Sequence, residues 1–308
     1  MIDIYMKLKF SFIMTLISCI LISIVIIYKI YVVCNTYSYD NETYNNYNKN
    51  NDNIQFLTKD DVIILFNQDK DNYVKNMSIA DLHARHIKNA SEYINNIIKC
   101  VSEFNEIQMT KLIRCAKKAD KFLKDYNYNN SIYSILCQDI ASIPWKFALT
   151  KKVYNGRDQY TNKEISLEYE EGLPHTRNDV IFLSSYIIND IISIDKHDEH
   201  LVSTLIHEKV HIFQRYNPDI VHKIIEKLGF KEYEYHNNLK RCNPDINDKC
   251  YIDSNGIPLI ILYNSMKPTG INDIKSDNYT MEHPYEKMAY DIANAYTQQN
   301  LIDIMKTL

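Results

Sequence analysis

Glycine and proline are scarce in this chain, with 5 and 7 copies among 308 residues. Their scarcity excludes collagen-like proteins and low-complexity chains rich in these two residues. The 7 cysteines are too few and too scattered for a small fold held together by disulfides. Neither sign of charge dominates, because 35 basic residues stand against 39 acidic ones. We therefore expect no nucleic acid among the partners of this protein.

The composition is that of a folded protein. Hydrophobic residues make up 45% of the chain and charged residues 24%, which excludes a wholly disordered chain. The length gives room for one large domain or two small ones.

One long apolar run lies near the N-terminus. No charged residue occurs from Phe10 to Tyr28, and a helix of this length spans about 28 Å, close to the hydrocarbon thickness of a bilayer. A signal peptide has a shorter apolar region that ends at small residues. Here the apolar sequence continues beyond Lys29 to Val33. The sequence therefore predicts a transmembrane anchor within residues 1–34.

The charges around this run predict its orientation. Lys7 and Lys9 precede the run, and acidic residues follow it. This distribution favours a cytoplasmic N-terminus and an extracytoplasmic body, as in a single-pass membrane protein. In that compartment Cys242 and Cys250 can form a disulfide, and the alternative is two free thiols.

The residues after the anchor divide into a stalk and a domain. Residues 35–57 are rich in Asn, Tyr and Asp without apolar periodicity, which predicts a flexible stalk. Apolar residues recur at helical spacing over 58–130, and short β-branched and aromatic runs follow from about residue 140. We therefore expect an α+β domain over residues 58–308. It has a helical subregion, then a catalytic core at 140–308 with a small mixed sheet and two helices.

The first of these two helices carries the clearest chemical motif. Residues 207–211 read His-Glu-Lys-Val-His, within a helix predicted from Asp198 to Tyr216. Histidines four residues apart project from one face of a helix, so His207 and His211 can reach the same metal ion. Glu208 borders that face, where it can take a proton from a metal-bound water instead of binding the metal itself.

A catalytic zinc ion needs three protein ligands and an open fourth position. The sequence Ile-Phe-Gln-Arg-Tyr after His211 lacks the third histidine of the metzincins and excludes that class. A carboxylate from a later helix is the other solution. Pro284 opens the last predicted helix and places Glu286 in its first turn. Glu282 and His283 are the alternative ligands.

The motifs HEKVH and HPYEKMAY together resemble the gluzincin class of zinc metallopeptidases, in which a Glu on a second helix completes the zinc site. With PHTRNDVIFLS and RCNPD, they look like zincin-type peptidases encoded by large DNA viruses, over roughly residues 78–297. The resemblance implies a zincin-like domain with one Zn²⁺ per chain. It implies His207, His211 and Glu286 as the ligands and Glu208 as the general base.

Peptide hydrolysis also requires a group that stabilises the oxyanion. The candidates for this role, or for contacting substrate, are Tyr290, His175, His283 and Tyr285. Tyr290 stands where the best-known gluzincin pattern has an Asp that orients the first His. By analogy with zincins, we expect the strand Val180–Leu183 at the sheet edge, paired with extended substrate. The alternative is an interior strand that packs Ile181 and Leu183.

The sequence thus predicts a membrane-anchored zinc metallopeptidase that acts on a peptide or protein, in a host or virion membrane if the chain is viral. The alternative is a catalytically idle zinc-binding protein that recognises partners at a membrane or virion surface. The two predictions share the zinc site and differ in the use of Glu208.

Overall fold

A computed structural model describes residues 53–126, 132–157, 164–192, 198–247, 249–275 and 283–307. The predicted anchor at 1–34 and the predicted stalk up to residue 52 lie outside these ranges. Among the helices in these ranges, none combines the length and apolar character that a membrane span requires.

The described residues form a mixed α/β fold, so the prediction of helices combined with a small mixed sheet is confirmed. Its helices are α2 (Lys59–Gln68), α3 (Ile79–Ala84), α4 (Ala90–Cys100), α5 (Glu106–Asp125), α6 (Ser134–Ser142), α7 (Ser185–Ile192), α8 (Asp198–Tyr216), α9 (Pro218–Lys227) and α10 (Pro284–Thr307), with a 3-10 turn η1 (Tyr169–Gly172). Capping boxes fix the starts of three of these helices, with Thr58, Ser78 and Asn105 as the N-cap residues.

The main sheet has five strands: β1 (Ile54–Phe56), β2 (Val101–Ser102), β3 (Trp145–Thr150), β6 (His175–Arg177) and β7 (Val180–Ser184). Its order is β1-β3-β7-β6, and β2 pairs with β3. Strands β1 and β7 run parallel to β3, whereas β2 and β6 run antiparallel to their neighbours. The sheet is therefore mixed, as predicted.

Two smaller sheets complete the fold. Strands β4 (Val153–Arg157) and β5 (Glu164–Leu167) form a hairpin. Strands β8 (Lys231–Tyr233), β9 (Cys250–Ile252) and β10 (Pro258–Leu259) form a three-stranded sheet beside long connecting loops.

Strand β1 corrects the predicted end of the stalk at residue 57. Ile54 pairs with Trp145 and Phe56 with Phe147, so this segment belongs to the main sheet. Ile54 and Phe56 also pack on the hydrophobic core. The sequence did not predict this three-residue strand, because polar residues precede it and its stability comes from pairing with β3.

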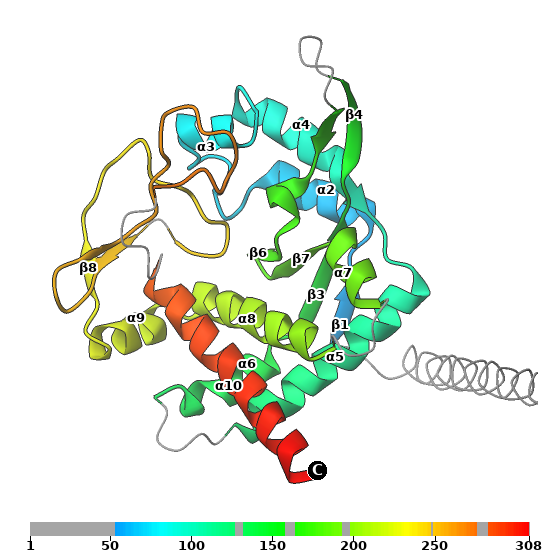
Figure 1. Cartoon of the computed structure of the whole chain (residues 1–308), viewed down its shortest axis with the longest axis vertical. Coiled ribbons are helices and arrows are strands. Elements are labelled where there is room, and N and C mark those ends of the chain that lie inside the picture. Colours follow the sequence, from blue (N-terminus) through cyan, green and yellow to red (C-terminus); the bar gives the residue numbers. More distant parts are fainter. Residues whose placement is uncertain are drawn as a thin grey trace, which may run out of the picture. The chain divides into compact units, whose positions relative to one another are not determined.

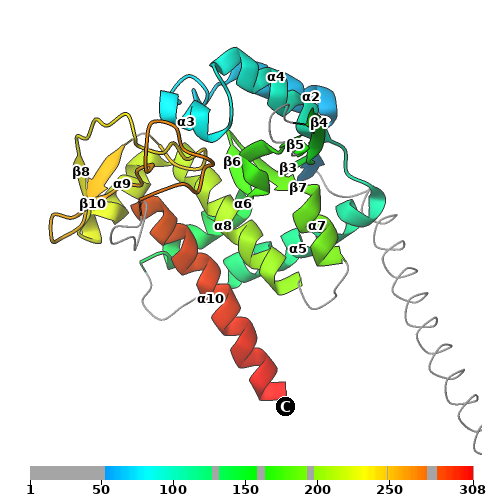
Figure 2. The same cartoon turned by 45° about the horizontal axis from the view of Figure 1, so that its top comes forward.

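The main sheet separates two hydrophobic cores, and Figures 1 and 2 show helices on both of its sides. The side chains of β3 and β7 that face α5, α6, α8 and α10 include Phe147, Leu149, Ile181 and Leu183. Those that face α2 and α4 include Ala148, Val180 and Phe182. This alternation is expected of strands that are buried on both faces.

Strand β7 is an interior strand, so the prediction of a substrate-binding edge at Val180–Leu183 is wrong. It lies between β3 and β6, and both Ile181 and Leu183 are fully buried. The alternative from the sequence, an interior strand that packs these two residues, is confirmed. The edge on that side of the sheet is β6.

The described cysteines are free thiols, including Cys242 and Cys250. The disulfide between these two residues is therefore absent, and the alternative of two free thiols holds. The Cys242 thiol lies 3.4 Å from the carbonyl oxygen of Asn76.

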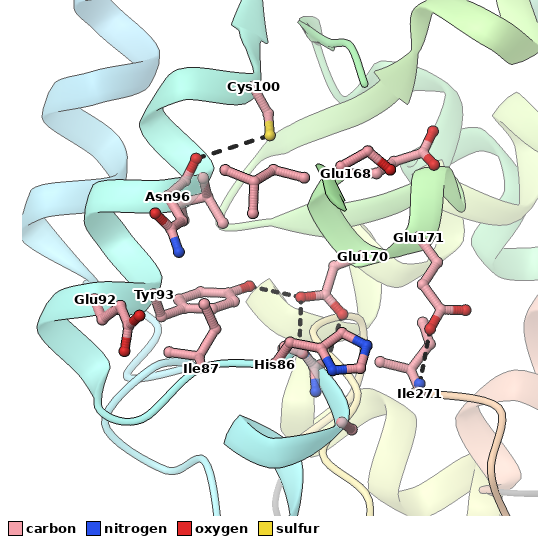
Figure 3. Close-up of a pocket in the computed structure, with 15 residues that line it drawn as sticks. His86, Ile87, Glu92, Tyr93, Asn96, Cys100, Glu168, Glu170, Glu171 and Ile271 are labelled. Atoms are coloured by element: carbon pink, nitrogen blue, oxygen red, sulfur yellow. Dashed lines mark hydrogen bonds and ion pairs between the residues drawn. The ribbon is translucent and has the colours of Figure 1, made fainter. Parts of the chain in front are cut away.

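A buried ion pair lines a cavity of about 360 Å³ between α4 and η1 (Figure 3). The Arg85 guanidinium donates to the Glu170 carboxylate, with Nε at 2.9 Å from Oε1, and the Tyr93 hydroxyl donates to the same oxygen at 2.6 Å. Burial by itself raises the pKa of Glu170, but the Arg85 charge and these hydrogen bonds outweigh it and lower the pKa to about 2. The pair joins α3, α4 and η1.

We predict that Glu170→Gln lowers the free energy of unfolding by roughly 3–5 kcal/mol at pH 7, because it leaves a buried guanidinium without its counter-charge. The folded pKa lies below the usual 4.5. The contribution of the Glu170 charge to the free energy of unfolding is therefore complete above pH 4.5 and is lost as the pH falls toward 2.

Urea unfolding of both proteins at pH 7 and at pH 3 tests this prediction, with the exposed Glu103→Gln as the control. The stability difference between wild type and Glu170→Gln should be smaller at pH 3. An equal difference at both pH values would contradict the assigned cause.

Candidate metal centre

Helix α8 holds the HEKVH motif inside the core. It spans Asp198 to Tyr216 as predicted, and Pro218 starts the next helix directly after it. Apolar residues within the motif and on both sides of it are buried in the core, among them Leu205, Ile206, Val210, Ile212 and Phe213. The positions of His207 and His211 are therefore fixed by the packing of the helix that carries them.

Helix α10 brings the third residue of the cluster. It begins at Pro284, and His283 caps it, because the His283 Nδ1 atom accepts a hydrogen bond from the Tyr285 N–H at 3.2 Å. Glu286 therefore lies in the first turn, as predicted. Figure 1 shows α10 beside α8, and the Ser203 hydroxyl of α8 donates to the Ala293 carbonyl of α10 at 3.3 Å.

The two helices bring His207, His211 and Glu286 together. The Nε2 atoms of the two histidines lie 2.9 Å apart. The Glu286 Oε2 atom lies 3.3 Å from the His207 Nε2 atom and 3.5 Å from the His211 Nε2 atom. In the part of the chain that the structure describes, this is the one cluster of His, Cys, Asp and Glu with the spacing of a metal site.

The two alternative third ligands fare differently. Glu282 lies outside the described residues. His283 is used elsewhere, because its Nδ1 atom caps α10 and its Nε2 atom lies 3.2 Å from the Lys249 carbonyl oxygen. Since Nδ1 accepts, Nε2 carries the proton and donates to that carbonyl.

The charges of the cluster are strongly coupled. Burial lowers the pKa of His211, but the adjacent Glu286 carboxylate outweighs this effect and raises it to about 9. Burial raises the pKa of Glu286, and the neighbouring His211 charge outweighs it and holds the pKa well below its usual value. Without a metal ion, a proton on His211 balances Glu286. A cation that binds here replaces this proton, so binding must weaken at low pH.

Gln214 fixes the orientation of His211, and it was missed from the sequence. The Gln214 Nε2 atom donates to the Tyr285 carbonyl oxygen at 2.9 Å, so its Oε1 atom faces the His211 Nδ1 atom at 2.8 Å. Once the balancing proton has left, neutral His211 therefore carries its remaining proton on Nδ1 and directs the Nε2 lone pair at the cluster. The signal in the sequence was a polar residue three positions after His211, on the same helix face.

His207 is held differently. Its ring packs against the Tyr290 ring, with the centroids 4.5 Å apart. Its Nδ1 atom has no hydrogen-bond partner within the described residues. Asp291, which follows Tyr290, is bound to Lys287 at 2.7 Å and to the Tyr133 hydroxyl at 3.0 Å. The Asp that orients the first His in the best-known gluzincins therefore has no counterpart at Tyr290 or Asp291.

Glu208 is buried, with 4% of its surface exposed. Burial raises its pKa well above the usual value, and the nearby Asp245 and Glu286 carboxylates raise it further. Its Oε2 atom has no hydrogen-bond partner among the described residues. Such a carboxylate binds a proton readily, which is the property of a general base.

Of the four further residues predicted for the site, Tyr290 is the one whose ring contacts a residue of the cluster. Tyr285 is buried beside Tyr251 and supplies the carbonyl that binds Gln214. His175 stacks on Phe182, with centroids 5.3 Å apart, in the core on the α2 and α4 side of the sheet. That face of the sheet is opposite to α8, so His175 is not part of the cluster.

The outer edge of β6 is occupied by side chains. The two-residue turn after Arg177 leaves the N–H and carbonyl of Thr176 pointing away from β7. The Thr176 N–H donates to Asp245, whose Oδ1 atom also accepts from the Thr176 hydroxyl at 2.9 Å. The Arg215 guanidinium donates to that hydroxyl at 3.0 Å and to the Thr176 carbonyl at 3.4 Å. The positions that an added strand would use are therefore filled.

The cluster has to be interpreted from its own chemistry. Comparisons of the chain with protein-family models, with curated proteins and with solved structures give no match. The likeness of HEKVH and HPYEKMAY to gluzincin motifs therefore stays an expectation.

We predict that Gln214→Leu weakens metal binding by about 10–100-fold, because His211 loses the acceptor that fixes its tautomer. Gln214→Glu keeps an acceptor for the His211 N–H and should retain more of the affinity. Titration with Zn²⁺ against a chromophoric chelator measures both. Equal affinities for the Leu variant and wild type would show that packing alone orients His211.

Proposed function

We propose that this protein is a zinc metallopeptidase whose zinc ion is bound by His207, His211 and Glu286. The observation that carries the proposal is the convergence of two imidazole Nε2 atoms and one carboxylate oxygen from two helices. Two histidines and one glutamate are an established ligand set for catalytic zinc, and they leave a fourth position open.

The distances fit a small tetrahedral cation such as zinc. In a tetrahedron with arms of 2.0–2.1 Å, two ligand atoms lie about 3.3 Å apart. The three separations in the cluster are 2.9, 3.3 and 3.5 Å. Ligand atoms at these spacings fit one small cation with little movement. The Gln214 contact supports the same interpretation, because it keeps a proton on the His211 Nδ1 atom, so that Nε2 is the nitrogen that a cation can bind in place of a proton.

The surrounding residues support hydrolysis. Zinc, when bound, supplies a Lewis acid that lowers the pKa of water and polarises a carbonyl group. Glu208 accepts the proton of the attacking water and passes it to the leaving amine, a role that suits a carboxylate whose pKa is raised. Tyr290 lies against His207 and is half exposed, so its hydroxyl is the candidate donor to the oxyanion.

The proposal includes the fold family and the location predicted from the sequence. In the proposed zincin-like domain, the two active-site helices are α8 and α10. The apolar residues 10–28 serve as a single membrane anchor with a cytoplasmic N-terminus, which places the domain outside the cytoplasm. A peptide or protein on that side is the substrate.

One observation favours a second function, a zinc-binding protein that recognises a partner without hydrolysis. Extended peptides bind many proteins by adding a strand to a sheet edge. At β6 that position is taken by Asp245 and Arg215. A protein with no peptide to process has no need of a free edge.

We predict that Glu208→Gln keeps zinc but loses peptide hydrolysis by about 10²–10⁴-fold, since the general base is removed and the ligands are not. His207→Ala should lose both zinc and hydrolysis. The measurements are elemental analysis of the unit Asn53–Leu308 and turnover of a peptide library, with the exposed Glu226→Gln on α9 as the matched control.

The outcomes separate the two functions. Zinc in the wild type without hydrolysis of any library peptide would favour the binding protein. Absence of zinc from the folded wild type after zinc is added would exclude both proposed functions. Full turnover by Glu208→Gln would exclude Glu208 as the base.

A further inference from the structure

We propose that Asn243 is a positioning residue for Glu286, which it holds so that a single carboxylate oxygen faces the metal. This inference rests on the zinc site proposed above. The Asn243 Nδ2 atom donates to the Glu286 Oε1 atom at 3.1 Å. The other oxygen, Oε2, is the one that lies 3.3 and 3.5 Å from the two histidine Nε2 atoms.

The orientation of the Asn243 amide is determined by its own segment. The Asp245 N–H donates to the Asn243 Oδ1 atom at 3.0 Å, which forms a local side-chain turn. With its oxygen used in this way, the amide can only present its NH₂ group to Glu286. The donor is therefore in place before any metal ion binds.

The segment 243–245 is anchored at two further points. The Arg215 guanidinium donates to the Pro244 carbonyl at 3.0 Å. Asp245 accepts hydrogen bonds from the N–H and hydroxyl of Thr176 in β6. Arg215 lies on α8, four residues after His211, so the helix that carries both histidines also holds the segment that orients Glu286. These contacts assign a role to the RCNPD motif, which the sequence alone left without one.

The physical consequence concerns the freedom of the Glu286 side chain. A carboxylate held through one oxygen cannot rotate to bind a metal through both, and it is kept from turning toward solvent. A fixed ligand loses less conformational entropy when the metal binds. Partners that hold a metal ligand in this way typically contribute 10–100-fold to metal affinity.

The test compares Asn243→Ser and Asn243→Ala with wild type, in the full-length protein. A serine oxygen can still accept the Asp245 N–H and keep the turn, but its side chain is too short to donate to Glu286. We expect both variants to bind Zn²⁺ about 10–100-fold more weakly in a chelator competition assay. The absorption spectrum of the Co²⁺-loaded protein should also change, because the carboxylate is free to alter its coordination.

Asn255→Ala is the matched control, since Asn255 is an exposed asparagine in the turn after β9 that also bonds within its own turn. It should bind Zn²⁺ like the wild type. Thermal unfolding of the metal-free proteins should show a cooperative transition for Asn243→Ser as for wild type, which establishes that the variant is folded.

Two results overturn the inference in different ways. Wild-type affinity and an unchanged Co²⁺ spectrum in Asn243→Ser would overturn the positioning role and leave the zinc site standing. A wild-type protein that binds neither ion would overturn the zinc site and the positioning role together.

Discussion

The docking of the first turn of α10 on α8 is the constraint on which the candidate site depends. Neither helix holds three ligands alone, and the cluster exists because Glu286 is brought to His207 and His211. Gln214 links the two helices at that point, since its amide bonds both His211 and the Tyr285 carbonyl. A shift of α10 along α8 would therefore break the orientation of a histidine and displace the carboxylate at the same time. The contact that packs α10 on α8 therefore also sets the position of Glu286 relative to His207 and His211.

This arrangement places several polar groups in the core. Glu208, Lys209, His211 and Gln214 are all buried on α8, and buried polar groups are costly unless they find partners. Lys209 bonds Asp120 at 2.6 Å and lies 4.0 Å from the centre of the Trp145 ring, so its charge is compensated away from the cluster. Gln214 and His211 satisfy one another. The Glu208 Oε2 atom lacks such a partner among the described residues.

The sequence predicted the parts of the site that depend on local spacing. Four-residue periodicity on one helix brings His207 and His211 together, and Pro284 fixes the start of the helix that carries Glu286. It did not predict contacts between distant segments. The hydrogen bonds of Asn243 and Asp245 depend on how a long loop folds back over β6. The apolar periodicity of a sequence does not predict the path of such a loop. The analogy with zincins predicted strand β7 at the sheet edge, but β7 pairs with β3 on one side and with β6 on the other. His175 was a candidate because its segment leads into the strand Val180–Leu183, yet strand alternation turns it to the opposite face.

The segment 243–245 links the two functions proposed for the site. An extended peptide that adds a strand to β6 has to displace Asp245 from Thr176. Asn243 belongs to the same turn and bonds Glu286, so displacing Asp245 also releases the ligand carboxylate. Strand addition at β6 and a fixed Glu286 therefore compete for one segment. If the protein hydrolyses peptides with Glu286 held as described, the substrate must reach the cluster without adding a strand to β6. Such an approach leaves the segment 243–245 and its bond to Glu286 in place.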